Sequence, residues 1–366
     1  MSAQGGGAGD ATDEARRDAF AARILQSVLG AFDLFSVYLG ERLGLYAALA
    51  AGAATPADVA DRAGCDARYV REWLEHQAVS GLLEAHATDG GARRYALPPE
   101  HAEVLLAQDS LSYLAPVARL AAGVLAVTPR VLDAYRTGAG IPYADYGADM
   151  REGQAGANRA MFLELIAREW FPAVPDLHAR LRDAPARVAD IGCGAAWSSI
   201  GIARAYPHAL VDAFDLDEAS VDLARANVAA HGLDERVRVQ LADASDPALA
   251  GVYDVVTVFE ALHDMARPVA ALETVRRILA PRGFALVVDE RVAEEFTAPG
   301  DDIERLMYGW SIFHCLPSSR AETPSAATGT VMRPATLRAY AQEAGFKDIE
   351  VLPVEHEFFR FYRLRP

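Results

Sequence analysis

Residues 187–194 read RVADIGCG, an apolar run that ends in Asp190 and the alternating glycines Gly192 and Gly194. The run predicts a buried β-strand, and the two glycines let the backbone turn sharply and approach a ligand closely. Similar apolar runs, each followed by an amphipathic helix pattern, continue toward the C-terminus. Near-continuous apolar strands that alternate with helices predict a doubly wound α/β fold, in which a mostly parallel sheet is covered on both faces. The glycine loop then lies at the carboxyl edge of the sheet, where ligands bind.

Two further strand patterns end in carboxylates at the same edge. DAFDLD places Asp215 at the end of the second strand, where a carboxylate can hold both hydroxyls of a ribose, and LADAS places Asp243 at the end of the third, where it can accept from an adenine amino group. Asp190 suits a cationic ligand better than a pyrophosphate. Trp197 stands where the dinucleotide pattern requires a third glycine, which argues against NAD or FAD. Each carboxylate taken singly is also explained as a helix cap.

The segments VADIGCG, AFDLD, LADAS and YDVVTVFEALHD, in this order, resemble the motifs of class I S-adenosylmethionine-dependent methyltransferases. The resemblance implies a Rossmann-like sheet of seven strands, S-adenosyl-L-methionine as cofactor and S-adenosyl-L-homocysteine as product. The family often has a third glycine where this chain has Ala196, so we expect that methyl group to alter how the cofactor's tail sits. The cofactor contacts that the resemblance implies are Asp190, Gly192 and Gly194 for the methionine part, Asp215 for the ribose, Leu216, Asp243 and Ala244 for the adenine, and Phe259 for the floor.

Composition and charge restrict the possible partners. The chain has 366 residues, enough for two domains, and a formal net charge of −16 from 35 basic and 51 acidic residues. So acidic a surface repels phosphate backbones, which makes nucleic acid an unfavoured partner. Three widely spaced cysteines suggest no disulfide framework and favour a cytoplasmic location. We expect no membrane association, because no uninterrupted apolar stretch of about 18 residues occurs.

Four sections are predicted along the chain. Residues 1–19 are polar and Gly-rich, which predicts a disordered tail. Residues 20–107 show helix-start signals, a second amphipathic helix and a hairpin that turns at 89–91, a pattern typical of a winged-helix domain. Residues 108–185 predict a helical linker and pocket wall, and 186–366 form the cofactor-binding domain.

The winged-helix section has two interpretations. A DNA reader would carry a basic second helix, but Arg68 and Arg71 are balanced there by Glu72 and Glu75. The section is also similar to the dimerisation domain of small-molecule O-methyltransferases, which implies a homodimer formed through this section. A cofactor-sensing transcriptional regulator remains the alternative from another class.

The candidate chemistry lies in FEALHD, residues 259–264, just past the fourth strand pattern. Methyl transfer from a sulfonium is an in-line displacement, and histidine is the natural base for a hydroxyl acceptor near neutral pH. The LHD triplet resembles the His-Asp pair of plant-type O-methyltransferases, which implies His263 as catalytic base. We expect Glu322 or Glu290 to orient its ring, and Asp264 to cap the next helix without contacting the ring. The plain structural alternative is a solvated or helix-capping histidine.

Two segments are candidates for the acceptor site. Tyr143 and Tyr146 lie in a Gly-rich loop; their side chains either hold the loop together or line a substrate pocket. Met307, Trp310 and His314 share a helix pattern and belong either to the core or to the pocket lining. Glu260, His263 and His314 are the candidate metal ligands in this region. Their spacing matches no recognised ligand set, so no metal is predicted.

Together these observations predict an S-adenosylmethionine-dependent enzyme that methylates a small-molecule acceptor, with O-methylation of a natural-product-like hydroxyl as the first hypothesis and His263 as its general base. C- or N-methylation, which needs no base, and cyclisation without methyl transfer remain alternatives. The acceptor itself leaves no signature in the sequence.

Overall fold

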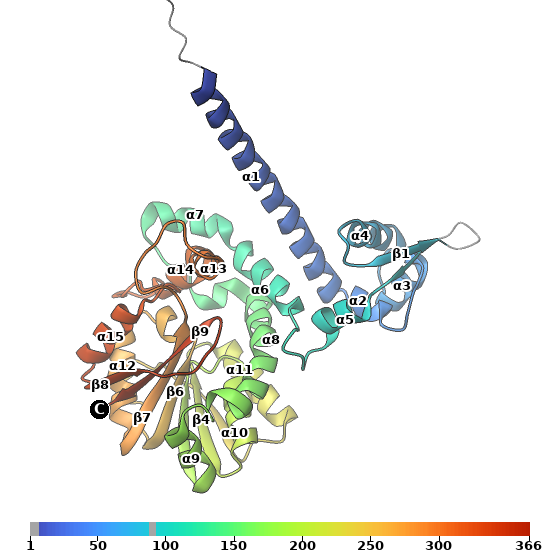
Figure 1. Ribbon diagram of the computed structural model, residues 1–366. Helices are drawn as coiled ribbons and strands as arrows, with labels where there is room; N and C mark the ends of the chain where they lie inside the picture. Colours follow the sequence, from blue (N-terminus) through green and yellow to red (C-terminus); the bar gives the residue numbers. More distant parts are fainter. Residues whose placement is uncertain (1–6, 88–92) are drawn as a thin grey trace, which may run out of the picture. The chain divides into compact units, whose positions relative to one another are not determined.

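The computed structural model describes residues 7–87 and 93–366, with side chains from residue 12 onward (Figure 1). The chain divides into two compact units, Met1–Ala122 and Gly123–Pro366. The predicted boundary after residue 107 therefore lies earlier than the observed one. Close packing explains the difference, because a Cβ atom at Gly123 would lie 2.2 Å from the backbone nitrogen of Met150, so this part of the helix belongs with the second unit.

The second unit is built on a sheet of seven strands in the order β5-β4-β3-β6-β7-β9-β8. The first five run parallel to one another, whereas β9 pairs antiparallel with both β7 and β8. This arrangement confirms the predicted doubly wound, mostly parallel fold (Figure 1). The strands are β3 (Ala186–Ile191), β4 (Ala209–Asp215), β5 (Val237–Leu241), β6 (Tyr253–Phe259), β7 (Leu279–Glu290), β8 (Asp348–Val351) and β9 (Phe359–Arg365).

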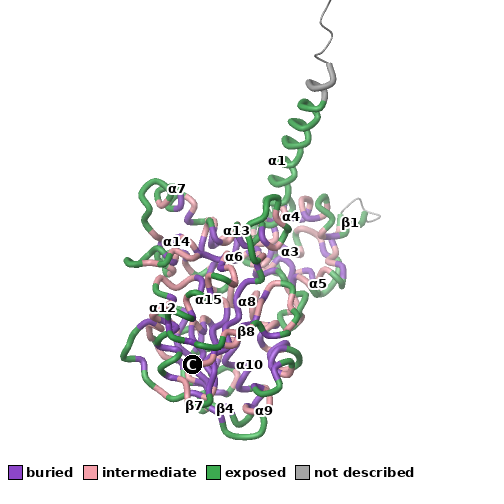
Figure 2. Tube along the Cα trace, turned by 60° about the vertical axis from the view of Figure 1, so that its left-hand side comes forward, coloured by how far each residue is buried: buried purple, intermediate pink, exposed green. Residues whose placement is uncertain are grey.

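Alternating side chains of these strands feed two cores, one on each face of the sheet. On β3, Val188 enters the first core and Ala189 enters the second; on β6, Val255 and Val256 divide in the same way. Figure 2 shows the buried interior that results. Burial on both faces is the reason that the strands read as continuous apolar runs. The first core is covered by α8 (Gly147–Leu165), α9 (Pro175–Asp183), α10 (Trp197–Ala205) and α11 (Glu218–Ala230), and the second by α12 (Pro268–Ile278) and α15 (Pro334–Glu343).

The helical section predicted over 108–185 is broken near its end in the structure. α8 passes into a π-helical turn, η2 (Ile166–Trp170), where the N–H of Phe171 donates to the carbonyl of Ile166. Regular helix resumes only at Pro175, the first residue of α9. Prolines 172 and 175 lack the N–H that a continuous helix needs, and proline suits the first helical position.

The remaining elements of the second unit carry the segments predicted to wall the acceptor site. Tyr143 and Tyr146 bound a short 3₁₀ turn, and the candidates Met307, Trp310 and His314 lie on one continuous helical stretch with a π-helical turn inside it. These elements are α7 (Thr128–Thr137), η1 (Tyr143–Tyr146), α13 (Asp302–Trp310), η4 (Ser311–Cys315) and α14 (Leu316–Ser319); α6 (Ala115–Ala126) crosses the boundary between the units.

The first unit contains the predicted winged helix. Thr55 and Asp58 form a reciprocal capping box at the start of α3 (Pro56–Ala63), as the sequence signals predicted. α4 (Ala67–Val79) follows, and β1 (Glu84–Ala87) pairs antiparallel with β2 (Arg93–Ala96). The predicted turn at 89–91 lies outside the described residues. Two short helices, α2 (Leu45–Leu49) and α5 (Pro99–Leu106), complete the unit.

The first helix, α1 (Gly7–Arg42), replaces most of the predicted disordered tail. The prediction is wrong from residue 7 to residue 19, because the apolar pattern downstream extends the helix backward through polar residues; residues 1–6 lie outside the described part. Contrary to expectation, Thr12–Arg42 is long and apolar enough to cross a membrane by length and composition alone. α6 and α7, bent by 49°, pass the same test as a pair, which core helices also pass. Figure 2 shows α1 exposed along most of its length.

Candidate active site

The loop after β3 has the tight geometry that its glycines predicted. Gly192 and Gly194 have positive φ angles of 70° and 51°, in a region that glycine enters freely. A Cβ atom at Gly192 would lie 2.6 Å from the Cβ of Ala261, whereas one at Gly194 would meet nothing within 4 Å. The glycine loop therefore packs directly against the turn that follows β6 and carries His263.

Asp190 anchors this loop. One of its carboxylate oxygens accepts from the hydroxyls of Ser198 and Ser199, each at 2.6 Å, and the other accepts from Thr257 at 2.8 Å. Burial raises the pKa of Asp190, although the three hydroxyl donors oppose the rise. The carboxylate thus joins β3, α10 and β6. Its predicted contact with the methionine part of a cofactor stays a prediction, since the hydrogen bonds that the structure shows run to protein hydroxyls.

Ala196 and Trp197, just after the loop, stand where glycine patterns of related motifs have glycine, and the structure shows how each is accommodated. Ala196 has a positive φ of 63° and is fully buried in the first core. Its methyl group is therefore packed inside the protein, and its expected effect on a bound cofactor stays a prediction. The Trp197 ring lies beneath the guanidinium of Arg159, 5.0 Å from its carbon, and the indole nitrogen is buried without a hydrogen-bond partner.

Asp215, at the end of β4, is tied to the same loop. Its carboxylate accepts from the backbone N–H of Gly194 at 2.8 Å and of Asp217 at 2.9 Å. Burial raises the pKa of Asp215 against these donors. Asp217 in turn accepts from Arg151 of α8 at 2.8 Å. The adjacent Leu216, predicted to meet adenine, is 59% exposed at this edge, so its apolar side chain is open to a ligand.

Asp243 follows β5 and has two protein partners. It accepts from the N–H of Ser245 at 2.7 Å and from Arg267 at 2.7 Å. Arg267 also pairs with Glu322, at 3.7 Å. The prediction that Glu322 orients His263 is therefore wrong, because this carboxylate pairs with Arg267 instead. Ala244 packs against the second core beside Asp243.

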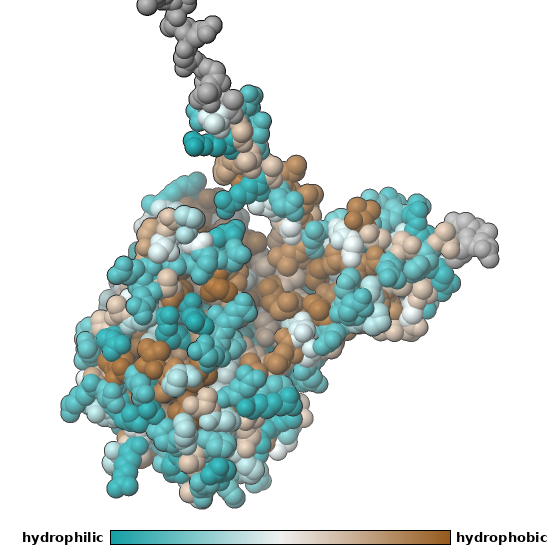
Figure 3. All heavy atoms as spheres, viewed as in Figure 1, coloured by the Kyte–Doolittle hydropathy of each residue, from teal (hydrophilic) through white to brown (hydrophobic). Residues whose placement is uncertain are grey.

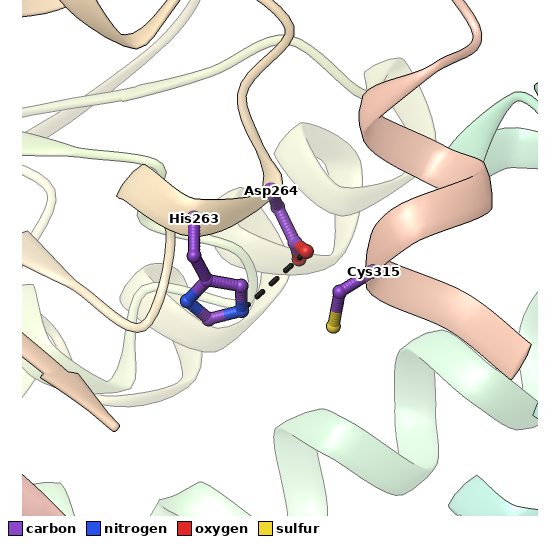
Figure 4. A group of neighbouring side chains, drawn as sticks. All are labelled: His263, Asp264 and Cys315. Carbon is purple, nitrogen blue, oxygen red and sulfur yellow. Dashed lines mark ion pairs between the residues drawn. The ribbon is translucent and has the colours of Figure 1, made fainter. Parts of the chain in front are cut away.

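His263 lies in a short 3₁₀ turn, η3 (Leu262–Asp264), and is only 2% exposed, which rules out the solvated alternative. Its Nδ1 is 2.9 Å from a carboxylate oxygen of Asp289, at the end of β7. Its Nε2 is 3.4 Å from Asp264 (Figure 4). Two predictions are corrected here: Asp289, rather than its neighbour Glu290, orients the ring, and Asp264 contacts the ring instead of capping α12.

The charges around His263 set its protonation. Burial alone would lower the pKa of His263, but Asp289 and Asp264 outweigh burial and hold that pKa well above its ordinary value. Burial also raises the pKa of Glu260 to about 8, with Asp289 and Asp264 adding to the rise. The pKa of Glu290 is raised too, by burial first and then by Glu260. Four carboxyl groups thus gather around one imidazole.

Glu260 has an unusual backbone conformation, which positions its side chain in this group. Its φ is +49°, a conformation that side chains rarely adopt, and Asn158 of α8 donates to its carboxylate at 3.1 Å. Phe259, predicted as part of the cofactor floor, turns the other way. Its ring centroid lies 5.2 Å from that of Phe162 and 6.3 Å from that of Trp170, so its side chain belongs to the first core.

The predicted acceptor residues converge only in part. The rings of Tyr143 and Tyr146 stand edge-on to His314, with centroids at 5.8 and 4.6 Å. Burial, reinforced by the charge of Asp215, raises the pKa of Tyr143. The Tyr146 hydroxyl donates to the carbonyl of Phe313 at 3.0 Å.

The other two acceptor candidates, Met307 and Trp310, precede His314 in the chain and lie on α13. Met307 is buried and Trp310 half-buried, on the helix that leads into η4. His314 itself is 6% exposed, and its Nε2 is buried without a hydrogen-bond partner. The structure thus groups His314 with the two tyrosines, while the acceptor roles of Met307 and Trp310 stay predictions.

Sequence reasoning missed several residues of this site. Asp289 had a usable signal, because strand alternation places it on the same face as Val287, in the second core, while Glu290 shares the face of Val288 in the first. Arg151 and Asn158 had no signal, since only the fold brings α8 to this edge. Cys315, discussed below, also lacked a recognisable pattern.

Comparisons with known families agree with this architecture. Residues 188–283 match the family described as Methyltransferase domain, and residues 33–107 match the Rv2258c-like winged HTH domain. The chain therefore carries a methyltransferase domain of the class I, S-adenosylmethionine-dependent fold, preceded by a winged helix-turn-helix domain. The predicted relationship and fold are thereby confirmed.

Curated relatives match less than a third of this chain. A ubiquinone biosynthesis O-methyltransferase of Marinobacter nauticus is 34% identical over 107 residues, which are 28% of this chain and 42% of that protein. Its counterpart in Xanthomonas axonopodis pv. citri is 36% identical over 105 residues, 29% of this chain and 43% of that protein. The chain thus matches about two fifths of the length of these relatives.

Solved structures share the fold over nearly the whole chain. A mitomycin 7-O-methyltransferase has a TM-score of 0.71 at 18% identity, with 96% of this chain and 99% of that one covered. Human N-acetylserotonin methyltransferase, solved in complex with SAM, has a TM-score of 0.68 at 20% identity, covering 94% and 97%. A riboflavin-type N,N-dimethyltransferase from Streptomyces davawensis has a TM-score of 0.62 at 21% identity, covering 94% and 98%. At these identities the likeness concerns the fold.

Two alanine substitutions separate backbone strain from crowding in the glycine loop. We expect Gly194→Ala to lower the free energy of unfolding by about 1–2 kcal/mol, the cost of a left-handed backbone. Gly192→Ala should cost about 1–3 kcal/mol more, because its methyl group also collides with Ala261. Urea denaturation of both variants measures the difference, and equal losses would contradict the packing described for this loop.

Proposed function

We propose that this protein transfers a methyl group from S-adenosylmethionine to a small-molecule hydroxyl, with His263 as general base. The observation that carries the proposal is the placement of His263. It is buried between Asp289 and Asp264, on the sheet edge that also holds the glycine loop and Asp215. When bound, the cofactor supplies a methyl group activated by a sulfonium. Because the curated relatives match over only part of their length, the activity of the whole chain is part of the proposal.

The residues at the edge fit such a cofactor. Gly192 and Gly194 offer a close backbone approach, Asp215 would hold the ribose and Asp243 the adenine amino group. A buried oxygen of Asp289 and one of Asp264 have no hydrogen-bond partner in the described structure. This surplus of acceptors and negative charge suits a cationic sulfonium, whereas it would repel a phosphate-bearing cofactor.

Asp289 and Asp264 would act on His263 in different ways. The Nδ1–H donates to Asp289 at 2.9 Å, which fixes the tautomer and leaves Nε2 to take a proton. At 3.4 Å, the separation of Nε2 from Asp264 exceeds the roughly 2.7–2.9 Å of a charge-assisted hydrogen bond, so Nε2 stays available to an acceptor hydroxyl. Both carboxylates also stabilise the imidazolium that forms when the proton arrives.

Tyr143, Tyr146, Met307, Trp310 and His314 would bind the acceptor. Supporting this, the first two and His314 form one aromatic group beside the candidate base. The names of the two curated relatives and of the mitomycin enzyme describe O-methylation, and one fold neighbour is named as an N,N-dimethyltransferase. N-methylation needs no base, so the two outcomes differ in their dependence on His263.

The direct test incubates the protein with methyl-labelled S-adenosylmethionine and a panel of phenols, enols and amines. For a hydroxyl acceptor, His263→Ala should lower kcat/KM about 100- to 10,000-fold, the usual contribution of a general base. Leu306→Ala, on the exposed side of α13, is the control and should stay near wild type. Full turnover by His263→Ala would show that the base assignment is wrong.

The pH profile of kcat/KM provides a second prediction. The base must be neutral, and its pKa is held well above the ordinary value, so activity should keep rising with pH beyond neutrality. Asp264→Asn removes one carboxylate that favours the imidazolium and should shift the rising limb to lower pH. Asp289→Asn should shift it likewise and also lower the plateau, because the ring loses its anchor.

The pH profile is measured in metal-free buffer, with an Asp-to-Asn control elsewhere on the surface, so that a shift reports on the carboxylates next to His263. Asp222→Asn, on the exposed surface of α11, removes the same charge far from the ring and should leave the limb in place. An unshifted limb in Asp264→Asn would contradict the proposed electrostatics.

The proposed assembly is a homodimer formed through α1. Large apolar residues on this helix are exposed, including Phe20 at 63% and Phe32 at 62% (Figure 3). Between them, Ile24, Leu25, Val28 and Leu29 recur at helical spacing along one side. The uncharged run between Arg23 and Asp33, which includes Gln26 and Ser27, spans about 14 Å of helix, roughly half of a bilayer's hydrocarbon core. A second copy of the same helix covers such a stripe symmetrically. The predicted cytoplasmic location stays a prediction.

Sedimentation of a charge variant tests the dimer. Ile24→Glu places a carboxylate in the apolar side of α1 and should convert the protein to monomer, whereas Gln26→Glu, on the other side of the helix, should stay dimeric. Monomeric wild-type protein, or binding of the wild type to neutral lipid vesicles, would contradict the proposed assembly.

A further inference from the structure

His263, Asp264 and Cys315 form a group that the methyl-transfer proposal does not fully use. One ligand atom from each of the three lies within 4.8 Å of the others. Figure 4 shows the Asp264 carboxylate and the Cys315 thiol on the same side of the His263 ring, with Cys315 coming from the π-helical turn η4. Imidazole, carboxylate and thiol together are the ligand types that Zn²⁺ prefers.

The separation between His263 and Asp264 fits a shared ion better than it fits a hydrogen bond. Zn–N and Zn–O bonds of about 2.0–2.1 Å in a tetrahedron place the two ligand atoms about 3.3–3.4 Å apart. The Nε2 of His263 and the Asp264 oxygen are 3.4 Å apart. That oxygen is buried and has no hydrogen-bond partner in the described structure.

Asp289 supplies the outer support that metal-binding histidines have. It accepts from the Nδ1–H of His263 at 2.9 Å, and this directs Nε2 toward Asp264 and Cys315. A carboxylate behind a ligating histidine fixes the tautomer and strengthens the ligand. The Nδ1 side of the His263 ring thus already has the hydrogen-bond partner that a metal-binding histidine needs.

His314 is a second, independent indication of a ligand here. It is 6% exposed, and its Nε2 has no hydrogen-bond partner among the described residues. Its other ring nitrogen is 3.4 Å from the Cys315 sulfur. A buried imidazole nitrogen without a partner, on the residue next to Cys315, is a second group that calls for a bound species.

We propose that His263 Nε2, the Asp264 carboxylate and Cys315 Sγ bind a thiophilic divalent cation of the Zn²⁺ class, with a fourth position open beside His314. On binding, the sulfur–metal and Nε2–metal bonds form, and the thiol proton and the Nε2 proton of the imidazolium leave to solvent. The occupied site then has no base for methyl transfer, so the metal is an inhibitor; this last step rests on the proposed function, whereas metal binding does not.

The test titrates the full-length protein, first stripped with a chelator, with Co²⁺ or Zn²⁺ alone and without cofactor or acceptor. Co²⁺ gives intense visible bands in a four-coordinate site, and a thiolate ligand adds a near-ultraviolet charge-transfer band. We expect one Co²⁺ per chain with both features, displaced by Zn²⁺, and no comparable binding of Mg²⁺, which prefers oxygen ligands. Absence of binding, or binding without the thiolate band, would overturn the proposal.

Three variants connect the signal to these residues. Cys315→Ser should abolish the thiolate band and weaken Zn²⁺ binding more than about 100-fold, because an inner ligand is lost. Asp289→Asn leaves the three ligands in place and should weaken binding about 10- to 100-fold with the band retained. Cys65→Ser, a cysteine of the winged-helix domain, should match wild type. Wild-type affinity in both Cys315→Ser and Asp289→Asn would overturn the site.

Inhibition is measured separately on the methyl-transfer reaction. Zn²⁺ should suppress turnover of the wild type, and a chelator should restore it. Turnover that continues at saturating Zn²⁺ would overturn the inhibitory role alone. A protein that binds Co²⁺ but shows no methyl transfer would contradict the proposed function and leave the metal site supported, so the two failures are distinguishable.

Discussion

The carboxylate of Asp190 is the interaction on which the site depends. It draws hydroxyls from α10 and β6 onto the end of β3, in the interior, where no water competes for them. With these three hydrogen bonds formed, the glycine loop packs against Ala261, and the 3₁₀ turn that follows carries His263. Loss of these hydrogen bonds would therefore separate the ligand-binding loop from the candidate base.

A second constraint is the charge at the carboxyl edge. Parallel strands end side by side, so the acidic residues that close β4, β6 and β7 are brought together by topology. Their buried, partly unpartnered oxygens favour cationic ligands, either the sulfonium of the cofactor or a divalent ion at His263. Under the two proposals, the same imidazole would serve a hydroxyl or a metal but not both at once.

The sequence predicted the sheet because its evidence is local. Apolar strands, glycine pairs and strand-end carboxylates can each be recognised from a few consecutive residues. The sequence therefore predicts the correct edge for Gly192, Asp215 and His263. The partner of His263 was missed because Asp289 and Glu290 are neighbours that strand alternation sends to opposite faces. Arg151, Asn158 and Cys315 were missed because helices distant in sequence deliver them. The helical N-terminus was missed because its polar residues carry no apolar signal of their own.

The central claim is that this edge binds S-adenosylmethionine through Asp215 and the glycine loop. Titration calorimetry of the full-length protein with the cofactor, comparing wild type with Asp215→Asn, tests it most directly. The account predicts one molecule bound per chain and affinity weakened about tenfold or more in the variant, the loss expected when a hydrogen bond to a charged group is removed. No binding by the wild type, or equal affinity in the two proteins, would contradict it.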